Sequence, residues 1–229
     1  MSAKLIQKST LEFLQTLSEN NNRDWFNANK ELYNSAHNNV SEFADALIGK
    51  MNLHDELETL TGKKALYRIY NDVRFNKDKS PYNSRFAFGL QRATKFKRGG
   101  YYLQIKPGNC FLGCGFFSPN SDDLKTIRQD IEINFEEWNE ILNSKEIIAN
   151  FGKMTGAQLA TAPRGFDKDH PAIDLLRYKQ FIFRCNITDE EVLAPDFLDK
   201  VNSLFKSIRP FFDYMSEVLT TDANGETII

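Results

Sequence analysis

The chain has few of the residues that mark exported or disulfide-stabilised proteins. It contains only three cysteines, Cys110, Cys114 and Cys185, and an odd number in a long chain is typical of reduced cytosolic thiols. The N-terminus lacks the basic, apolar and small-residue regions of a secretory signal. Charged residues interrupt every apolar stretch before the roughly 20 residues needed to span a bilayer. We therefore expect a soluble, cytoplasmic protein without a membrane partner.

Common catalytic and cofactor motifs are also absent. The sequence contains no nucleophile elbow, His-Glu-x-x-His motif, dinucleotide-binding glycine pattern, P-loop or EF-hand loop. Cys110 and Cys114 are four positions apart, but no second Cys/His pair lies nearby to complete a zinc site. We expect no metal and no cofactor, and the motifs leave open whether the protein is an enzyme.

The length and composition suit a folded domain. A chain of 229 residues with 41% hydrophobic content can fill a proper core. We find no internal repeat and no linker. The sequence therefore predicts a single domain over residues 1–229.

Apolar residues recur at helical spacing in four regions. A short helix is expected around Leu11 to Leu17, and a long one from Trp25 to Met51. The same spacing returns from Leu124 to Leu142. A final helix, from about Asp196 to Leu219, is expected to be kinked or restarted by Pro210.

A period of two, typical of strands, appears in the middle of the chain. Residues 66–75 alternate between a mostly apolar and a charged face. Short connections between the following strand patterns favour antiparallel pairing. We therefore expect an α+β fold, in which an antiparallel meander sheet (about residues 66–117 plus 181–186) is packed by N-terminal, central and C-terminal helices.

The net charge of −2 conceals a strong asymmetry. Residues 61–106 hold twelve lysines and arginines against only two acidic residues, Asp72 and Asp78, and the rest of the chain is acidic. Such a concentration of positive charge favours binding of an anionic partner.

The first candidate site lies in this basic segment. If residues 66–75 form a strand, Arg68, Asp72 and Arg74 share a face, and the carboxylate can orient the guanidiniums toward an oxyanion. The loop 77–82 could add ammonium and backbone N–H groups for a phosphate. The alternative is that these are solvent-facing charges on a half-exposed sheet.

A second reading of the same segment is nucleic-acid binding. Single-stranded nucleic acid is bound by aromatic faces that stack on bases and by cations that pair with phosphates, and both occur at Lys95, Lys97, Arg98, Tyr101 and Tyr102. The segment does not match the aromatic motifs of RNA-recognition sheets. Tyr101 suits the core equally well, because it alternates with Leu103 and Ile105.

His170 is the histidine best placed for chemistry. It lies in a loop, residues 164–171, and functional side chains concentrate on loops. Asp169 or Asp174 could raise its pKa and make it a general acid or base. The alternative is an ordinary His-Pro turn in front of a helix.

The segment 68–82, Arg-Ile-Tyr-Asn-Asp-Val-Arg-Phe-Asn-Lys-Asp-Lys-Ser-Pro-Tyr, resembles the signature of an uncharacterised bacterial and fungal family known as domain of unknown function 2461. Further matching stretches are 21–30, 100–103, 163–165, 169–171 and 176–179, so the resemblance covers nearly the whole chain. It implies one full-length domain and supplies no activity, substrate or cofactor. The family's recurring polar positions correspond to Arg68, Asp72, Arg74, Lys77, Asp78, Lys79, Arg164, His170, Arg177 and Lys179.

Together these observations favour a pocket for a phosphorylated or other anionic small molecule. In this hypothesis Asp72 orients the arginines, and His170 transfers a proton if the protein is catalytic. The expected ligand-binding residues are Arg68, Arg74, Lys77, Asp78, Lys79, Tyr82, Arg164, Arg177 and Lys179. The alternatives are a nucleic-acid-binding module that uses the Tyr-rich segment 63–106, and a structural protein whose acidic and basic regions pair within an oligomer.

Overall fold

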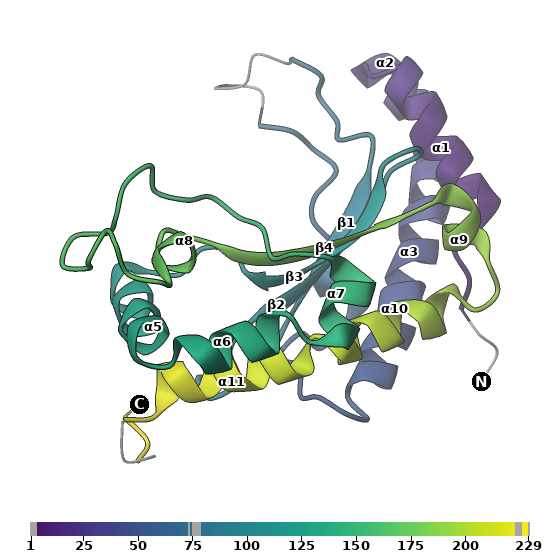
Figure 1. The fold of residues 1–229 in the computed structure, drawn as a ribbon. Helices are drawn as coiled ribbons and strands as arrows, with labels where there is room; N and C mark the ends of the chain where they lie inside the picture. Colours follow the sequence, from purple (N-terminus) through teal and green to yellow (C-terminus); the bar gives the residue numbers. More distant parts are fainter. Residues whose placement is uncertain (1–3, 73, 75–78, 223–225, 229) are drawn as a thin grey trace. The chain divides into compact units, whose positions relative to one another are not determined.

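The structure is a computed structural model that describes residues 4–72, 74, 79–222 and 226–228 (Figure 1). The chain divides into two compact units, each assembled from three segments. Unit 1 comprises Met1–Leu90, Tyr102–Leu112 and Asn186–Ser203, and unit 2 comprises Gln91–Tyr101, Gly113–Cys185 and Leu204–Ile229. The single domain expected from the sequence stays a prediction, and each unit is described by itself.

A four-stranded antiparallel meander confirms the α+β fold. Its strands are β1 (Phe86–Gln91), β2 (Gly100–Ile105), β3 (Cys110–Phe116) and β4 (Phe181–Ile187), in the order β1-β2-β3-β4. The boundary between the units passes through the strands, so every strand contributes residues to both.

Side chains alternate between the two faces of these strands, as the pleat requires. Within unit 1, Phe86 and Phe88 of β1 and Leu103 of β2 are buried on one face. Rings from the N-terminal helices pack against Phe86 from that side. Tyr102, which precedes Leu103, points to the opposite face and is less buried.

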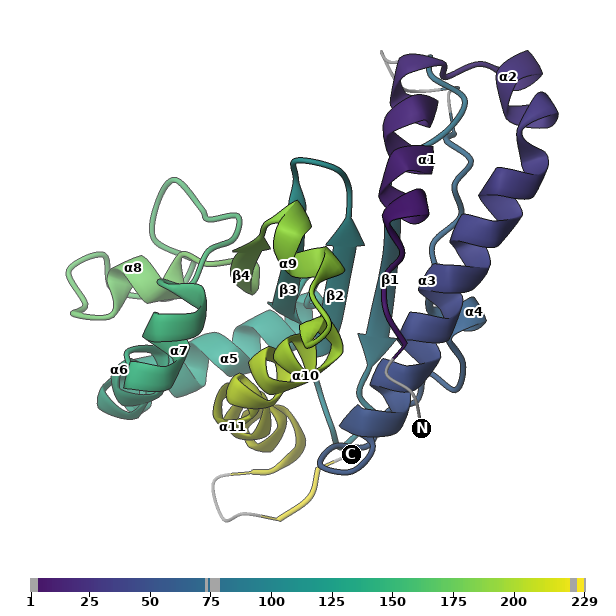
Figure 2. The ribbon, with the colours of Figure 1, turned by 90° about the vertical axis from the view of Figure 1, so that its right-hand side faces the viewer.

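Unit 1 contains the N-terminal helices. They are α1 (Lys8–Glu19), α2 (Arg23–Ala28), α3 (Lys30–Met51) and α4 (Gly62–Ala65), together with α9 (Asp189–Leu193) and the first part of α10 (Phe197–Ser207). Helices α1 and α3 run side by side (Figure 2). Their rings meet β1, since the centroids of Phe13 and Tyr33 lie 6.2 and 6.4 Å from that of Phe86.

The single helix expected from Trp25 to Met51 is wrong in one respect, because it is broken at Asn29. Asn29 ends α2 and begins α3, with a backbone φ of −110° and ψ of 25°. Its side-chain amide donates to the Trp25 carbonyl at 2.9 Å. A short amide side chain that competes for backbone partners in this way interrupts a helix without disturbing the apolar period on either side.

The strand expected at residues 66–75 is also wrong for its described part, which joins the sheet only through isolated bridges. Leu66 bridges Phe88 and Tyr70 bridges Tyr82, both antiparallel. A regular ladder does not form between the two bridges because their registers differ: the step from 66 to 70 on one segment faces the longer step from 88 to 82 on the other. Residues 73 and 75 lie outside the described part of the chain.

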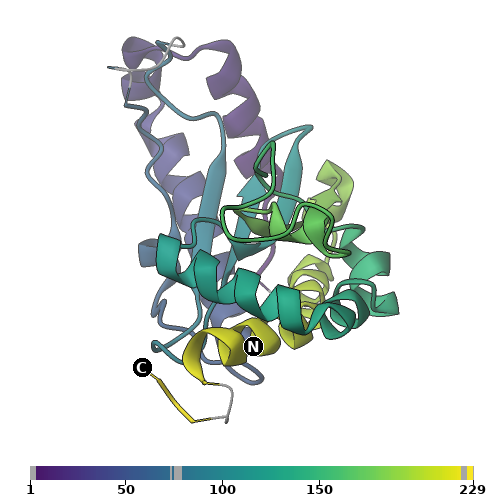
Figure 3. The same ribbon diagram turned by 60° about the vertical axis from the view of Figure 1, so that its left-hand side comes forward.

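Unit 2 contains α5 (Ser121–Ile133), α6 (Phe135–Leu142), α7 (Lys145–Phe151), α8 (Ile173–Leu176), the end of α10 and α11 (Arg209–Thr220). Figure 3 shows α5 and α11, which pack against each other. The helix expected from Leu124 to Leu142 is divided at Asn134, as its N-terminal counterpart is at Asn29. The expected interruption at Pro210 is confirmed as a restart, with the proline in the first turn of α11, where its missing N–H costs little.

The core of unit 2 is aromatic. Phe211 packs edge-on against Phe183 of β4 and Phe116 of β3, with ring centroids 5.1 and 6.0 Å apart. Tyr101 of β2 is buried between Phe205 and Phe212. The sequence pattern that placed Tyr101 in phase with Leu103 and Ile105 therefore identified a core residue.

Candidate functional site

Asp72 and Arg74 are brought together in a two-pronged ion pair on the surface of unit 1. Arg74 Nε donates to Asp72 Oδ1 at 2.9 Å, and Nη2 donates to Oδ2 at 2.7 Å. The Arg74 backbone N–H also donates to Oδ1, at 3.2 Å. A guanidinium held at two points by a carboxylate has a fixed direction.

The electrostatics of this pair keep both groups charged. The hydrogen bonds from the Arg74 side chain lower the pKa of the Asp72 carboxyl, the Arg74 backbone N–H lowers it further, and the positive charge of Arg68 adds to the effect. The same contact raises the pKa of Arg74. Arg68, Asp72 and Arg74 are all exposed, so solvent can reach the ion pair and the second cation that acts on it.

The other predicted residues of unit 1 have different surroundings. Lys77 and Asp78 lie outside the described residues, and Lys79 is exposed. Tyr82, which the sequence analysis expects to contact a ligand, is buried, and its ring stacks on Phe26 with centroids 3.9 Å apart. The Tyr82 backbone N–H donates to Asn21 Oδ1 at 3.1 Å, and Asn21 Nδ2 donates to the Tyr82 carbonyl at 2.8 Å. Tyr82 thus anchors the extended segment to the helices of unit 1.

Arg177 is held by backbone carbonyls of unit 2. Its Nε donates to the Leu159 carbonyl at 3.1 Å, and Nη2 donates to that of Ala160. These donors brace the loop before α8, and the role of Arg177 in ligand binding stays a prediction. Arg164 and Lys179, by contrast, are exposed.

His170 lines a shallow hollow of about 440 Å³ in unit 2. Its Nδ1 accepts a hydrogen bond from the Ala172 backbone N–H at 3.0 Å, so the imidazole closes the turn before α8. The two carboxylates expected beside His170 form ion pairs with other residues. Asp169 Oδ2 lies 4.0 Å from Lys168 Nζ, and Asp174 Oδ1 lies 3.8 Å from Arg177 Nη1.

The lining of this hollow is acidic, with side chains that include Glu132, Glu136 and Glu137. Negative charge of this kind favours a cation over the anion that the sequence led us to expect beside His170. In the described ranges of the chain, no group of three or more His, Cys, Asp or Glu side chains is arranged to hold a metal ion.

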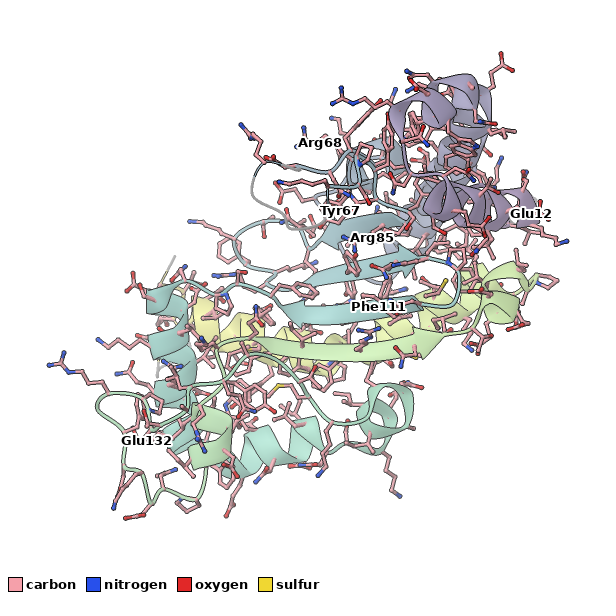
Figure 4. The ribbon with its side chains drawn as sticks, turned by 90° about the horizontal axis from the view of Figure 1, so that it is seen from above. Glu12, Tyr67, Arg68, Arg85, Phe111 and Glu132 are labelled. Carbon is pink, nitrogen blue, oxygen red and sulfur yellow. The ribbon has the colours of Figure 1, made fainter. Side chains whose placement is uncertain are left out.

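A row of rings in unit 1 was recognised only in part from the sequence, because Tyr67 and Tyr102 fall within the Tyr-rich segment 63–106 of the nucleic-acid alternative and Phe111 does not. We call Tyr67, Tyr102 and Phe111 the aromatic face. The ring centroids of Tyr67 and Tyr102 are 6.0 Å apart, and those of Tyr102 and Phe111 are 5.5 Å apart. Figure 4 looks onto this side of the strands and labels Tyr67 and Phe111. The sequence pattern that could have identified this face is the alternation of Tyr102 and Phe111 with buried residues of β2 and β3.

Gly89 makes room for the first ring of this row. A Cβ atom at position 89 would stand 2.6 Å from the Tyr67 hydroxyl oxygen, so Tyr67 lies directly over the backbone of β1. Arg85, which is also labelled in Figure 4, is exposed and precedes β1 in phase with Gly89. The exposed cations of the same stretch of unit 1 are Lys63, Lys64, Arg68, Arg74, Lys79 and Arg85.

The basic loop between β1 and β2 belongs to unit 2, and its arginines serve the fold. Arg92 is buried and bonds Asp213, and Arg98 pairs with Asp123 on α5. Lys95 lies over the ring of Phe96, and its ammonium nitrogen is 5.6 Å from the ring centroid. This loop therefore offers less free positive charge than its composition indicates.

The comparisons with known proteins bear on identity and not on activity. No curated protein and no solved structure matches the chain. In the part of the chain that the structure describes, no helix is both long and apolar enough to cross a membrane. A family model described as "Conserved hypothetical protein (DUF2461)" matches residues 9–214. Since this match covers most of the 229 residues, the chain belongs to that family of conserved hypothetical proteins.

Proposed function

We propose that the protein binds a phosphorylated or otherwise anionic ligand through the exposed basic surface of unit 1. The ion pair of Asp72 and Arg74 carries this proposal, because the carboxylate fixes the guanidinium at two points while leaving it in contact with solvent. A pre-oriented guanidinium loses less conformational entropy when it captures an oxyanion. Arg68, which acts on the same carboxylate, supplies a second positive charge nearby.

The proposal concerns binding and assigns no reaction. His170 was the candidate for proton transfer, but its hollow is lined with glutamates, which would repel an anionic substrate. Arg164 and Lys179 are exposed in unit 2 and remain candidate contacts on the basis of the sequence alone. We also propose a cytoplasmic location, which the three cysteines support, because none of them forms a disulfide among the described residues.

A thermal-shift screen tests the binding proposal. Nucleotides, phosphorylated metabolites and short oligonucleotides are added to the protein, to Arg74→Ala and to a control, Lys153→Ala, which removes an exposed cation from unit 2. A ligand present at about 100 times its Kd should raise the Tm by roughly 5 °C or more.

The expected result is a shift in the wild type and in Lys153→Ala that Arg74→Ala loses. If the Arg74→Ala variant keeps the full shift, or if no anion shifts the wild type, the proposal is wrong. Circular dichroism of each variant without ligand checks that the substitution leaves the fold intact.

A further inference from the structure

We propose that the aromatic face of unit 1 binds the bases of a single-stranded nucleic acid. This inference rests on the proposed function, because the cations that would hold an anionic ligand are those that would pair with the phosphates of the strand. It adds the class of ligand and a set of contacts, Tyr67, Tyr102 and Phe111, that the anion site does not require.

Two of the three rings have contacts that restrict them before any ligand arrives. Tyr67 is 59% exposed, yet it is seated over the backbone of Gly89. The Tyr102 hydroxyl donates to Gln104 Oε1 at 3.3 Å, and Gln104 Nε2 donates to the Asn109 carbonyl at 3.0 Å. Side chains fixed in this way need little ordering on binding, which favours affinity.

A row of rings on a sheet is suited to nucleic-acid bases. Every base has a π-face, so stacking on aromatic side chains tolerates any sequence. Aromatic side chains on a four-stranded sheet are one established means by which proteins stack two or three bases of RNA. The three rings of the aromatic face follow one another across the strands, with neighbouring centroids 6.0 and 5.5 Å apart.

The arrangement favours a single strand over a duplex or a mononucleotide. In a duplex the base faces are hidden within the stack, so rings that bind by stacking require unpaired bases. One base would cover only part of the row. The cations are likewise dispersed along the chain, from Lys63 and Lys64 on α4 to Arg68 and to Arg85 before β1, and this dispersion suits a succession of phosphates.

The charge on this part of unit 1 makes a polyanion the complementary partner. The described residues 61–72, 74, 79–90 and 102–112 contain seven lysines and arginines and one acidic residue, Asp72. Among the described residues, neither Arg68 nor Arg85 forms an ion pair. Their guanidiniums are therefore available to phosphate oxygens, which release counterions on binding.

Fluorescence anisotropy with matched probes tests this inference. The labelled probes are an oligo(dT) of about 12 nucleotides, an oligo(U) of the same length, and an abasic sugar–phosphate strand with the same number of charges. The variants are Tyr67→Leu and Phe111→Leu, which remove a ring, and Tyr67→Phe, which keeps it. Phe96→Leu is the control, since it removes a 46% exposed ring of unit 2.

We expect the wild type, Tyr67→Phe and Phe96→Leu to bind at least one base-bearing strand about tenfold or more tightly than the abasic strand. Tyr67→Leu should lose this preference while its affinity for the abasic strand is unchanged. Tyr67 lies outside the named strands, so this variant tests the inference even if Phe111→Leu disturbs β3.

The outcomes separate the two proposals. Equal binding of abasic and base-bearing strands, lost in Arg74→Ala, would overturn the aromatic site and support the anion site. A preference for bases that survives Tyr67→Leu would also overturn the aromatic site. If no strand binds, the inference is wrong, and the thermal-shift screen with small anions then decides the proposed function separately.

Discussion

Arg92 and Asp213 form an ion pair in which only one partner is buried. The Arg92 side chain is 1% exposed, that of Asp213 is 55% exposed, and Nη2 and Oδ1 are 2.5 Å apart. The same guanidinium donates to the Arg98 carbonyl and to Ser216 Oγ, at 3.2 and 3.3 Å, and lies over the ring of Phe212. These contacts all lie within unit 2, and they fix the loop after β1 onto α11.

Removing the carboxylate should therefore destabilise the fold. Asp213→Ala is expected to lower the free energy of unfolding by about 2–3 kcal/mol, because a buried guanidinium loses its charged acceptor. Urea denaturation followed by circular dichroism measures this loss. Glu217→Ala, which removes an exposed carboxylate one turn later on α11, is the control and should change stability by less than about 0.5 kcal/mol. Equal losses of unfolding free energy in the two variants would contradict the role of Asp213 as the charged acceptor of Arg92.

Gly115 allows β3 and β4 to approach each other closely. Its φ is +148°, and a Cβ atom there would stand 2.1 Å from the Phe181 carbonyl oxygen. Gly115→Ala should therefore cost more than about 2 kcal/mol of stability, since backbone must move to relieve the clash. Gly152→Ala is the matched control, because φ there is +70° but nothing lies within 4 Å, and its cost should be about 1 kcal/mol. Thermal unfolding of both variants gives the comparison, and similar Tm losses would argue against the close approach.

The Asp72 carboxyl should titrate below its ordinary value. Hydrogen bonds from Arg74 lower the pKa of this carboxyl. The ion pair is therefore fully formed above the ordinary carboxyl pKa of about 4, and it is lost as the pH falls through the lowered pKa. Carboxyl-detected NMR titration of the wild type and of Arg74→Gln measures the effect. The midpoint should rise toward the ordinary value in Arg74→Gln, and an unchanged midpoint would show that Arg74 does not hold the carboxylate in solution.

The three thiols should differ in reactivity. Burial raises the pKa of the Cys110 thiol to about 12 and that of Cys114 well above its usual range, whereas Cys185 is only half-buried. Because the thiolate is the nucleophile, iodoacetamide at about pH 8 should modify Cys185 first. Mass spectrometry of digested samples follows each site, with labelling in urea as the control in which all three react. Fast modification of Cys114 in the folded protein would contradict this burial.

The fold was predictable where local patterns decide it. The period of two in the segments that became β1, β2, β3 and β4 located them, and a proline in a helical pattern marked the restart at Pro210. The breaks at Asn29 and Asn134 were not predictable from the period, because the apolar stripe continues on both sides of each asparagine. The segment 66–72 alternates like a strand, but its pairing changes register between the bridges Leu66–Phe88 and Tyr70–Tyr82, which a period of two cannot show.

The candidate site was predictable only where its residues are close in sequence. Asp72 and Arg74 are two positions apart, and their pairing follows from local geometry. Tyr82 and Arg177 were expected to face a ligand, but their surroundings come from distant segments: Phe26 stacks on the one and the carbonyl of Leu159 holds the other. Tertiary contacts of this kind leave no trace in the local pattern of a single sequence.

The division of the chain into two units built from alternating segments has a consequence for how the protein is made. Unit 1 needs residues 186–203, which are synthesised long after its first 90 residues. A ribosome that adds about 5–20 residues each second would expose those early helices for several seconds before their last partners emerge. For the same reason no single cut of the gene yields either unit whole. A shortened version that retains a complete sheet must therefore be made by trimming the ends and not by dividing the middle.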